Sequence, residues 1–249
     1  MRRFFVEHLK PGDEFCSIKG PEARHISKVL RMRQGDRLVL MDSKGARFLA
    51  LIESVNFREV LVRIETSLPK PVPSPVKIVL CQALLKSRAM DYVIQKASEL
   101  GVDSILPFTS QRSVIRIEKD RLDNRMRHWR EIAQASAKQS DRDRPADIDP
   151  VVTFSEVMEK WKKTDALKII LWENEPSRDL KTLLRAASPV IQFAGMVGPE
   201  GGFGREEVEA AGDAGFISVS MGNRVLRAET AAMTLVGIVQ YEWGDLGLL

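Results

Sequence analysis

The sequence predicts an α/β protein in two parts: a small β-barrel-like module over residues 1–70 and a larger domain with a parallel sheet over residues 76–249. Prolines stand at alternate positions from Pro69 to Pro75, which excludes a helix or a central strand and favours a stiff, extended connector. Before this segment the sequence shows short strand patterns, whereas strand and helix patterns alternate after it. Such alternation is typical of a parallel sheet covered by helices on both faces. We therefore assign residues 71–75 as a linker.

Short apolar runs separated by turn residues define the elements of the N-terminal module. A helix is expected to begin at Pro21, because proline is favoured in a first helical turn, and to run through Leu30. Gly35-Asp36 and Ser43-Lys44-Gly45 predict turns between strands. The expected strands are Phe15–Ile18, Arg37–Met41, Arg47–Val55 and Val60–Thr66.

In the larger domain, Gly101 is expected to close one helix and Ser155 to cap another. Ligands of parallel sheets bind at the carboxyl ends of the strands, so the loops after the strands are the places to search for chemistry. The expected strands are Val76–Leu85, Ile105–Phe108, Lys168–Trp172, Val190–Val197 and Ile217–Ser220. The expected helices are Met90–Leu100, Leu122–Gln139, Ser155–Lys163, Leu180–Ala187, Arg205–Ala214 and Ala228–Trp243.

Composition narrows the class of protein. An apolar content of 44% and a charged content of 29% are those of an ordinary soluble protein, and no apolar run approaches the roughly 20 residues that span a bilayer. Glu7, His8 and Lys10 interrupt the basic and apolar start of the chain, which argues against a signal peptide, so we expect a cytoplasmic protein. Cys16 and Cys81 are isolated from each other and from any His cluster, so we expect neither a disulfide nor a metal site.

Basic residues gather in two segments, 24–37 and 112–130, within a chain whose net charge of +4 is only mildly basic. Such clusters suit contacts with the phosphates of a nucleic acid. Solvated helix faces explain them slightly better when composition alone is considered.

Three loops at expected strand ends carry unusual residues. Residues 198–204 read Gly-Pro-Glu-Gly-Gly-Phe-Gly, with more glycines than a tight turn needs, but without the GxGxxG or Walker patterns of nucleotide-binding loops. The second loop follows the expected strand Ile217–Ser220 and ends where the last helix begins. Arg227, at this helix start, is electrostatically unfavourable unless it faces a phosphate, a substrate carboxylate or Glu200. Glu229 at the same helix start could simply complement the helix dipole. The third loop, Glu173-Asn174-Glu175, gains weight because it follows a neighbouring strand of the sheet.

These loops resemble the signature loops of the RsmE family, SPOUT-type methyltransferases that act on N3 of a uridine in ribosomal RNA. The resemblance rests on Gly198–Phe203 together with Ser220-Met221-Gly222 and Val225–Ala231, and it spans nearly the whole chain. Around Glu131–Arg142 the family is usually more acidic, whereas this chain has Ala135, Ala137 and Lys138. Further matching segments are Gln95–Val102, Gln111–Ser113, Lys138–Arg142, Arg3–Val6, His25 with Val29–Arg31, and Gly35-Asp36.

The resemblance implies a PUA-like β-barrel domain followed by a SPOUT domain with a trefoil-knotted parallel sheet. It also implies S-adenosyl-L-methionine bound in a bent form among the knotted loops, and a homodimer whose active sites lie near the interface. The expected substrate is small-subunit (16S) ribosomal RNA in the assembled small subunit, with no membrane and no metal involved. Because the last helix is apolar around much of its surface, Val236 is expected to lie at the dimer interface.

The expected catalytic residues are Arg227, Glu200 and Glu229, which could stabilise the uridine anion or act as the general base, and the roles among them stay open. The expected cofactor-binding residues are Leu171, Trp172, Glu173, Gly198, Pro199, Glu200, Gly201, Gly202, Ser220, Met221, Gly222, Arg224, Val225 and Leu226. The expected RNA-binding residues are Arg3, Arg24, His25, Lys28, Arg31, Arg33 and Arg112.

Two other functions stay open at this point. The chain could be an RNA-binding or ribosome-assembly protein that keeps the fold without turnover. It could also be a knotted methyltransferase with another RNA target, such as transfer RNA or a ribose hydroxyl.

Overall fold

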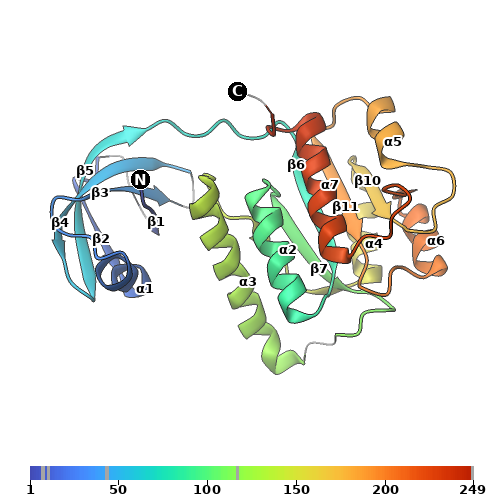
Figure 1. Cartoon of the computed structure of the whole chain (residues 1–249), viewed down its shortest axis with the longest axis horizontal. Helices are drawn as coiled ribbons and strands as arrows, with labels where there is room; N and C mark the ends of the chain where they lie inside the picture. The colour runs from blue at the N-terminus through green and yellow to red at the C-terminus, as the bar shows by residue number, and fades with distance from the viewer. Residues whose placement is uncertain (7–8, 10–11, 43–44, 116–117, 248–249) are drawn as a thin grey trace. The chain divides into compact units, whose positions relative to one another are not determined.

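The structure is a computed structural model that describes residues 1–6, 9, 12–42, 45–115 and 118–247. The chain forms two compact units. The first comprises Met1–Val72 together with Ala137–Arg144, and the second comprises Pro73–Ser136 together with Pro145–Leu249 (Figure 1). Each unit is described by itself below.

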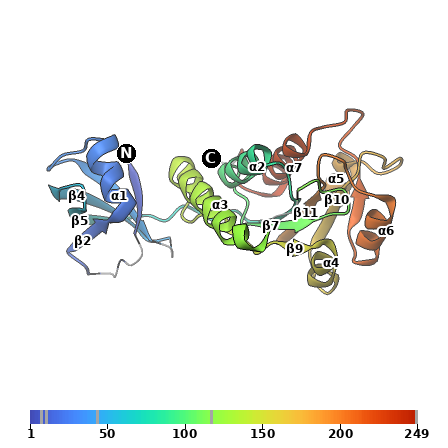
Figure 2. The same cartoon turned by 90° about the horizontal axis from the view of Figure 1, so that it is seen from below.

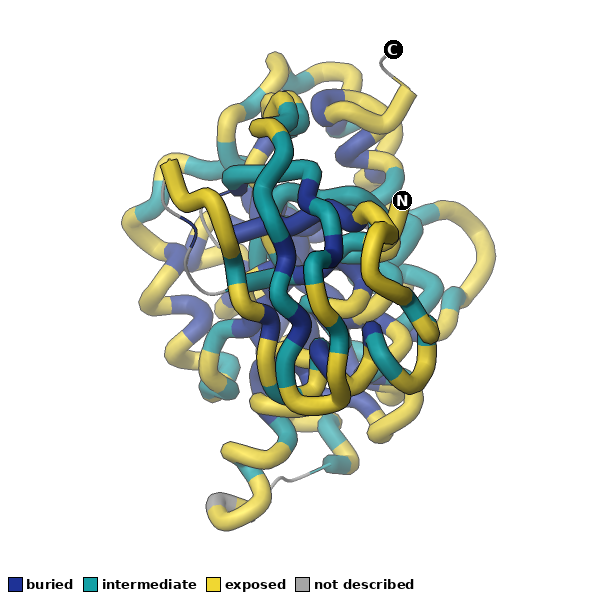
Figure 3. Tube along the Cα trace, turned by 90° about the vertical axis from the view of Figure 1, so that its left-hand side faces the viewer, coloured by how far each residue is buried: buried dark blue, intermediate teal, exposed yellow. Residues whose placement is uncertain are grey.

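The first unit is built on a curled, five-stranded sheet in the order β1-β3-β4-β5-β2. β1 and β3 run parallel, and the other pairs are antiparallel. Alternate residues of the strands point into one apolar core that contains Phe4, Ile18 and Ile52, while the turns are exposed (Figure 3). This confirms the expected barrel-like module. Its strands are β1 Arg3–Val6, β2 Phe15–Lys19, β3 Arg37–Asp42, β4 Arg47–Val55 and β5 Glu59–Leu68.

A helix closes this core, and Pro21 lies in its first turn as expected. The helix is regular only over α1, Gly20–Arg24, and continues as a π-helix, η1, over His25–Val29. The buried side chains Ala23 and Ile26 attach it to the sheet. Short π-helical segments are rare and frequently lie at functional sites.

The segment Ala137–Arg144 forms ion pairs with the strands and with α1 of the first unit. The Asp141 carboxylate forms ion pairs with Arg3 of β1, with 2.6 Å between Arg3 Nε and the carboxylate oxygen, and with Arg47 of β4. Lys138 pairs with Glu22 of α1. Asp141 has a left-handed backbone with φ of 61°, a conformation that aspartate adopts more readily than most residues.

The second unit contains a sheet in the order β12-β10-β11-β6-β7-β8, in which every pairing is parallel. β9 also pairs with β7. This confirms the parallel sheet expected from the alternating pattern. The strands are β6 Lys77–Ala83, β7 Ser104–Thr109, β8 Asp147–Ile148, β9 Val152–Thr153, β10 Leu167–Leu171, β11 Gln192–Val197 and β12 Ile217–Val219.

Helices cover both faces of this sheet. Neighbouring residues of a strand point to opposite faces, and apolar side chains lie on both of them. Leu80 and Phe193 pack under α2, α5, α7 and part of α3, whereas Cys81 and Ala194 pack under α4 and α6 (Figure 2). The helices are α2 Ser87–Glu99, α3 Lys119–Ser140, α4 Phe154–Lys162, α5 Leu180–Ala186, α6 Arg205–Asp213 and α7 Ala228–Trp243. No helix in the described part of the chain is both long enough and apolar enough to span a membrane.

Two details differ from expectation, and one is confirmed. Thr153, not Ser155, caps α4: its hydroxyl accepts the N–H of Glu156, whose carboxylate accepts the N–H of Thr153 in return. The prediction that Val236 lies at an interface is wrong, because this residue is 1% exposed and its side chain packs in the core under α7. Gly101 follows α2 with φ of +92°, as expected for a glycine that ends a helix.

Candidate active site

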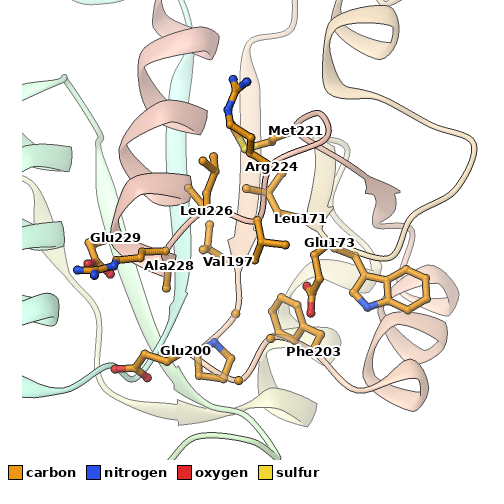
Figure 4. Close-up of a pocket in the computed structure, with 18 of the residues that line it drawn as sticks. Leu171, Glu173, Val197, Glu200, Phe203, Met221, Arg224, Leu226, Ala228 and Glu229 are labelled. Atoms are coloured by element: carbon orange, nitrogen blue, oxygen red, sulfur yellow. The ribbon is translucent and has the colours of Figure 1, made fainter.

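Three neighbouring strands deliver three loops to one cavity. β12, β10 and β11 are adjacent and parallel, so their carboxyl ends lie at the same edge of the sheet. The loops that follow them, 172–179, 198–204 and 220–227, line a cavity of about 1190 Å³ (Figure 4). This position matches the general rule for ligand sites of parallel sheets.

Every residue that the sequence indicated for catalysis or cofactor binding lines this one cavity. Their roles there stay predictions. The sequence did not indicate Lys86, Ser87 and Arg88, which line the cavity at the start of α2, because nothing in their residue types marks them. The only available signal was their position after β6, the next strand in the sheet. The indicated residues are Leu171, Trp172, Glu173, Gly198, Pro199, Glu200, Gly201, Gly202, Ser220, Met221, Gly222, Arg224, Val225, Leu226, Arg227 and Glu229.

The loop after β11 is held in a tight conformation that requires glycine at position 202. Gly202 has φ of +67°, and its N–H donates to the carbonyl of Pro199 at 2.9 Å. A Cβ at position 202 would collide with the carboxylate of Glu173 from the neighbouring loop. Phe203 anchors the loop in the core, where its ring stacks on that of Phe108 with 6.4 Å between centroids. The glycines therefore allow two loops to approach each other closely.

Glu207, in the first turn of α6, ties this loop to the loop after β7. Its carboxylate is buried at 2% exposure. One oxygen accepts the N–H of Gln111 and the other accepts the N–H of Gly204, both at 3.0 Å. Next to Gln111, Arg112 donates from Nη1 to the carbonyl of Gly201 at 3.1 Å. Glu207 stands three residues after the N-cap Gly204, the spacing at which a glutamate accepts the N-cap N–H, although Gly204 has no side chain to complete a capping box.

Glu200 and Arg227 do not pair with each other. A carboxylate oxygen of Glu200 accepts the backbone N–H of Lys86 at 3.1 Å, so Glu200 satisfies the first turn of α2. Arg227 is exposed and occupies the N-cap position of α7, where its carbonyl accepts the N–H of Ala231. Among the described residues, no carboxylate forms an ion pair with Arg227. Of the three partners considered for it, Glu200 is therefore excluded in this conformation.

The acidic side chains around the cavity are spread apart. Figure 4 shows Glu200 and Glu229 at one end and Glu173 at the other, beside Phe203. Glu175, in the same loop as Glu173, is nearly buried and accepts hydrogen bonds from the N–H and the hydroxyl of Ser177. Burial alone would raise the pKa of Glu175, but its hydrogen bonds and the nearby Arg178 outweigh burial and lower the pKa. Glu175 therefore stays ionised and holds the loop after β10.

The residues expected to bind RNA lie in three different settings. Arg3 is half-buried in its ion pair with Asp141, and Arg112 contacts the loop after β11 in the second unit. The ring of His25 packs edge-on against Phe4, with 6.4 Å between centroids. The others, on α1, on η1 and in the segment that follows, are exposed: Arg24, Lys28, Arg31 and Arg33. In the described part of the chain, no group of three His, Cys, Asp or Glu side chains could hold a metal ion.

Comparisons with known proteins identify the family. Residues 72–240 match a family described as RNA methyltransferase domain, and residues 18–65 match one described as RNA methyltransferase PUA domain. Ribosomal RNA small subunit methyltransferase E of Mycobacterium tuberculosis is 31% identical over 95% of this chain and 90% of the relative. The chain belongs to the RsmE family. The Bacillus subtilis member of this family is 26% identical over 97% of each chain.

Solved structures of similar proteins agree with this assignment. The RsmE of Neisseria gonorrhoeae, whose crystal structure contains S-adenosyl methionine, is 29% identical, covers 98% of this chain and 99% of its own, and has a TM-score of 0.90. A methyltransferase from Legionella pneumophila, also in complex with S-adenosyl methionine, is 32% identical with a TM-score of 0.89 over 98% of each chain. These likenesses confirm the fold class, with a PUA-like half-barrel before a SPOUT-type parallel sheet.

Proposed function

We propose that this protein transfers the methyl group of S-adenosyl-L-methionine to N3 of a uridine in small-subunit (16S) ribosomal RNA. The observation that carries the proposal is the convergence of the loops 198–204 and 220–227 on one cavity. The RsmE family membership of the chain supports ribosomal RNA as the substrate.

The cavity suits S-adenosyl-L-methionine in size and in chemistry. Its volume of about 1190 Å³ exceeds the roughly 300–1,000 Å³ of a typical small-molecule site, which leaves room for a second reactant. Apolar side chains such as Leu171, Val197 and Leu226 can hold the adenine ring, and Glu173 can face the positive charges of the ligand. The turn at Gly202 brings backbone close to the cavity without a Cβ in the way. When bound, the ligand supplies an electrophilic methyl group on a sulfonium.

The reaction requires the N3 proton of uridine to leave, because neutral N3 is a poor nucleophile. We assign the stabilisation of the resulting anion to Arg227, the cavity cation at the N-cap of α7, which is exposed and forms no ion pair with a described residue. Glu229, half-buried in the first turn of α7, is the candidate base. Glu200 is assigned a positioning role, because its carboxylate already caps α2.

The exposed cations of the first unit support RNA binding there, and we place the reaction on the small ribosomal subunit in the cytoplasm. We also propose a homodimer. On α7, Tyr241 is 72% exposed and Ile238 is 36% exposed, and Tyr92 on the neighbouring α2 is 44% exposed. An apolar surface of this kind is typical of an interface.

The test uses small subunits and naked 16S ribosomal RNA from a strain that lacks this gene. Each substrate is incubated with the purified protein and methyl-labelled S-adenosyl-L-methionine, and the nucleosides are separated by chromatography and mass spectrometry. We expect label only in 3-methyluridine, at one position, and equally in the presence of a chelator. Label in another nucleoside would refute the target. Binding of S-adenosyl-L-methionine without any transfer would favour a non-catalytic RNA-binding protein instead.

A further inference from the structure

A second hollow lies in the first unit, apart from the methyl-transfer cavity. It has a volume of about 410 Å³ and lies between α1 with η1 and the turn that joins β4 to β5. Gly20, Arg24, Lys28, Phe57 and Arg58 line it. Three of these five side chains are cationic, one is aromatic, and none is acidic.

The cations of this hollow are free to meet an anion. Arg24, Lys28 and Arg58 are all exposed. Among the described residues, no carboxylate forms an ion pair with any of them. The nearest acidic residues along the chain are engaged elsewhere, because Glu22 pairs with Lys138 and Glu59 pairs with Lys19. The local charge is therefore uncompensated and is available to an anionic ligand.

Phe57 is an exposed aromatic ring at the tip of a rigid turn. The side chain is 51% exposed. The Lys28 ammonium lies 5.6 Å and the Arg58 guanidinium 5.1 Å from the centroid of its ring, so cations flank it. Asn56 fixes the turn, because its side-chain oxygen accepts the N–H of Arg58 at 2.8 Å and that of Glu59 at 2.9 Å. The backbone that carries the ring is thus fixed before any ligand arrives.

The floor of the hollow is kept open by the backbone. Gly20 has φ of +68°, and a Cβ built there would have no atom within 4 Å. On the same side, the π-helical turn η1 displaces the positions after His25 from the spacing of a regular helix. Among the described residues, Phe57 does not belong to the apolar core of the unit, and its side chain is half exposed, so the hollow is a small site open to solvent rather than a core defect.

We infer that this hollow binds one unpaired nucleotide of the RNA substrate, with the base against Phe57 and Arg58 and the phosphate between Arg24 and Lys28. Its volume is near the lower end for small-molecule sites, which fits a single nucleotide. An aromatic ring flanked by cations is the arrangement that stacks bases of single strands without reading their sequence. The inference rests on the proposed function for the identity of the RNA, but binding can be measured without methyl transfer.

The experiment measures affinity of the full-length protein for a fluorescent single-stranded 12-mer of uridine and adenosine, and for a blunt RNA duplex of equal length, across a salt series. Phe57→Ala should weaken binding of the single strand about tenfold, which corresponds to about 1.4 kcal/mol, within the range for loss of one base stack. It should leave the salt dependence unchanged, because no charge is removed. Phe57→Trp should retain the affinity, whereas Phe57→Leu, which keeps an apolar but not an aromatic side chain, should lose it.

Lys28→Ala should act differently from Phe57→Ala. Loss of one phosphate contact should weaken binding and reduce the salt slope by about 0.7, the value per phosphate for single strands. Two matched controls separate these effects from general ones. Phe15→Ala removes another aromatic ring of the same unit that is 47% exposed, and Lys163→Ala removes an exposed cation of the other unit. Both should bind the single strand as the unaltered protein does.

Several results would overturn the inference. Equal losses for the duplex and the single strand would show that no unpaired base is held. An affinity of Phe57→Leu equal to that of the unaltered protein would point to an apolar contact, such as a protein partner, instead of stacking. Unchanged affinity of Phe57→Ala and Lys28→Ala would mean that the hollow is only solvated. A protein that binds the probe as described but fails to methylate RNA would refute the proposed reaction and leave this site standing.

Discussion

Glu207→Gln should destabilise the loops that line the cavity, although Glu207 itself does not line it. The buried carboxylate accepts two backbone N–H groups, from Gln111 and Gly204, each at 3.0 Å. In glutamine one of the two oxygens becomes an NH₂ group that cannot accept, so one N–H is left without a partner: either the buried one of Gly204 or the partly buried one of Gln111. An unsatisfied buried donor costs about 1–3 kcal/mol. For a protein of this length, that loss lowers Tm by roughly 2–12 °C.

The same substitution should also reduce the affinity for S-adenosyl-L-methionine. Release of the Gln111 N–H loosens the loop that carries Arg112, and Arg112 holds the carbonyl of Gly201 in the loop after β11. A loop that must be ordered on binding costs affinity. We expect Kd to rise about tenfold, equivalent to about 1.4 kcal/mol, as measured by calorimetric titration below the unfolding temperature.

Glu206→Gln is the matched control. Glu206 lies in the same first turn and contributes the same charge to the helix dipole, but it is exposed and forms no hydrogen bond or ion pair with the described residues of either loop. It should lower Tm only slightly and leave Kd unchanged, since a dipole interaction is worth about 0.3–1 kcal/mol at the surface. If both substitutions had equal effects, the dipole would explain Glu207, and the two-loop tie would be refuted.

The remaining predictions concern catalysis, thiol chemistry and assembly. Arg227→Ala should lower turnover by about a hundredfold or more. Calorimetry should show a nearly unchanged affinity for S-adenosyl-L-methionine, because the Arg227 side chain is exposed and forms no ion pair with a described residue. Near-normal turnover would remove Arg227 from catalysis. Burial raises the pKa of the Cys81 thiol to about 12, so iodoacetamide at pH 8 should modify Cys81 only after unfolding. If mass spectrometry of the native protein showed Cys81 alkylated as fast as Cys16, the burial of Cys81 would be contradicted. Tyr241→Asp should shift the protein from dimer to monomer in sedimentation. It should not lower Tm, because the Tyr241 side chain is 72% exposed in the single chain. Sedimentation of the unaltered protein as a monomer would refute the dimer.

The sequence predicts this fold well where a pattern is long and its period is clear. The apolar run Ala228–Trp243 has the predicted bounds of α7, and the strands of the parallel sheet agree within a few residues. β8 and β9 have two residues each, which is too short for a period to show. The π-helical turn His25–Val29 was also beyond prediction, since five residues do not distinguish its spacing from that of a regular helix.

Long-range pairing explains most of what the sequence leaves out. α3 is one continuous helix, and nothing in its pattern shows that its last turn belongs to the first unit. That association depends on Asp141 meeting Arg3 and Arg47, which are 138 and 94 residues away along the chain. Similarly, the cavity loops were predictable because their glycines are local signals, whereas Lys86 joins the cavity only through the sheet order.

Two acidic residues near helix starts show why residue type and position do not decide a role. Glu200 lies in a glycine loop and suggests catalysis, yet its carboxylate caps α2 from a distant part of the chain. Glu207 lies in a first helical turn, where an acidic residue often does no more than complement the dipole, yet it is buried and holds two loops together. Arg227 is the opposite case, because its unfavourable helix-start position is not relieved by any ion pair with a described residue. A cation that the fold leaves uncompensated beside a cavity is available for an anion that forms only during reaction, which is why Arg227, rather than either glutamate, is the residue on which the proposed chemistry depends most.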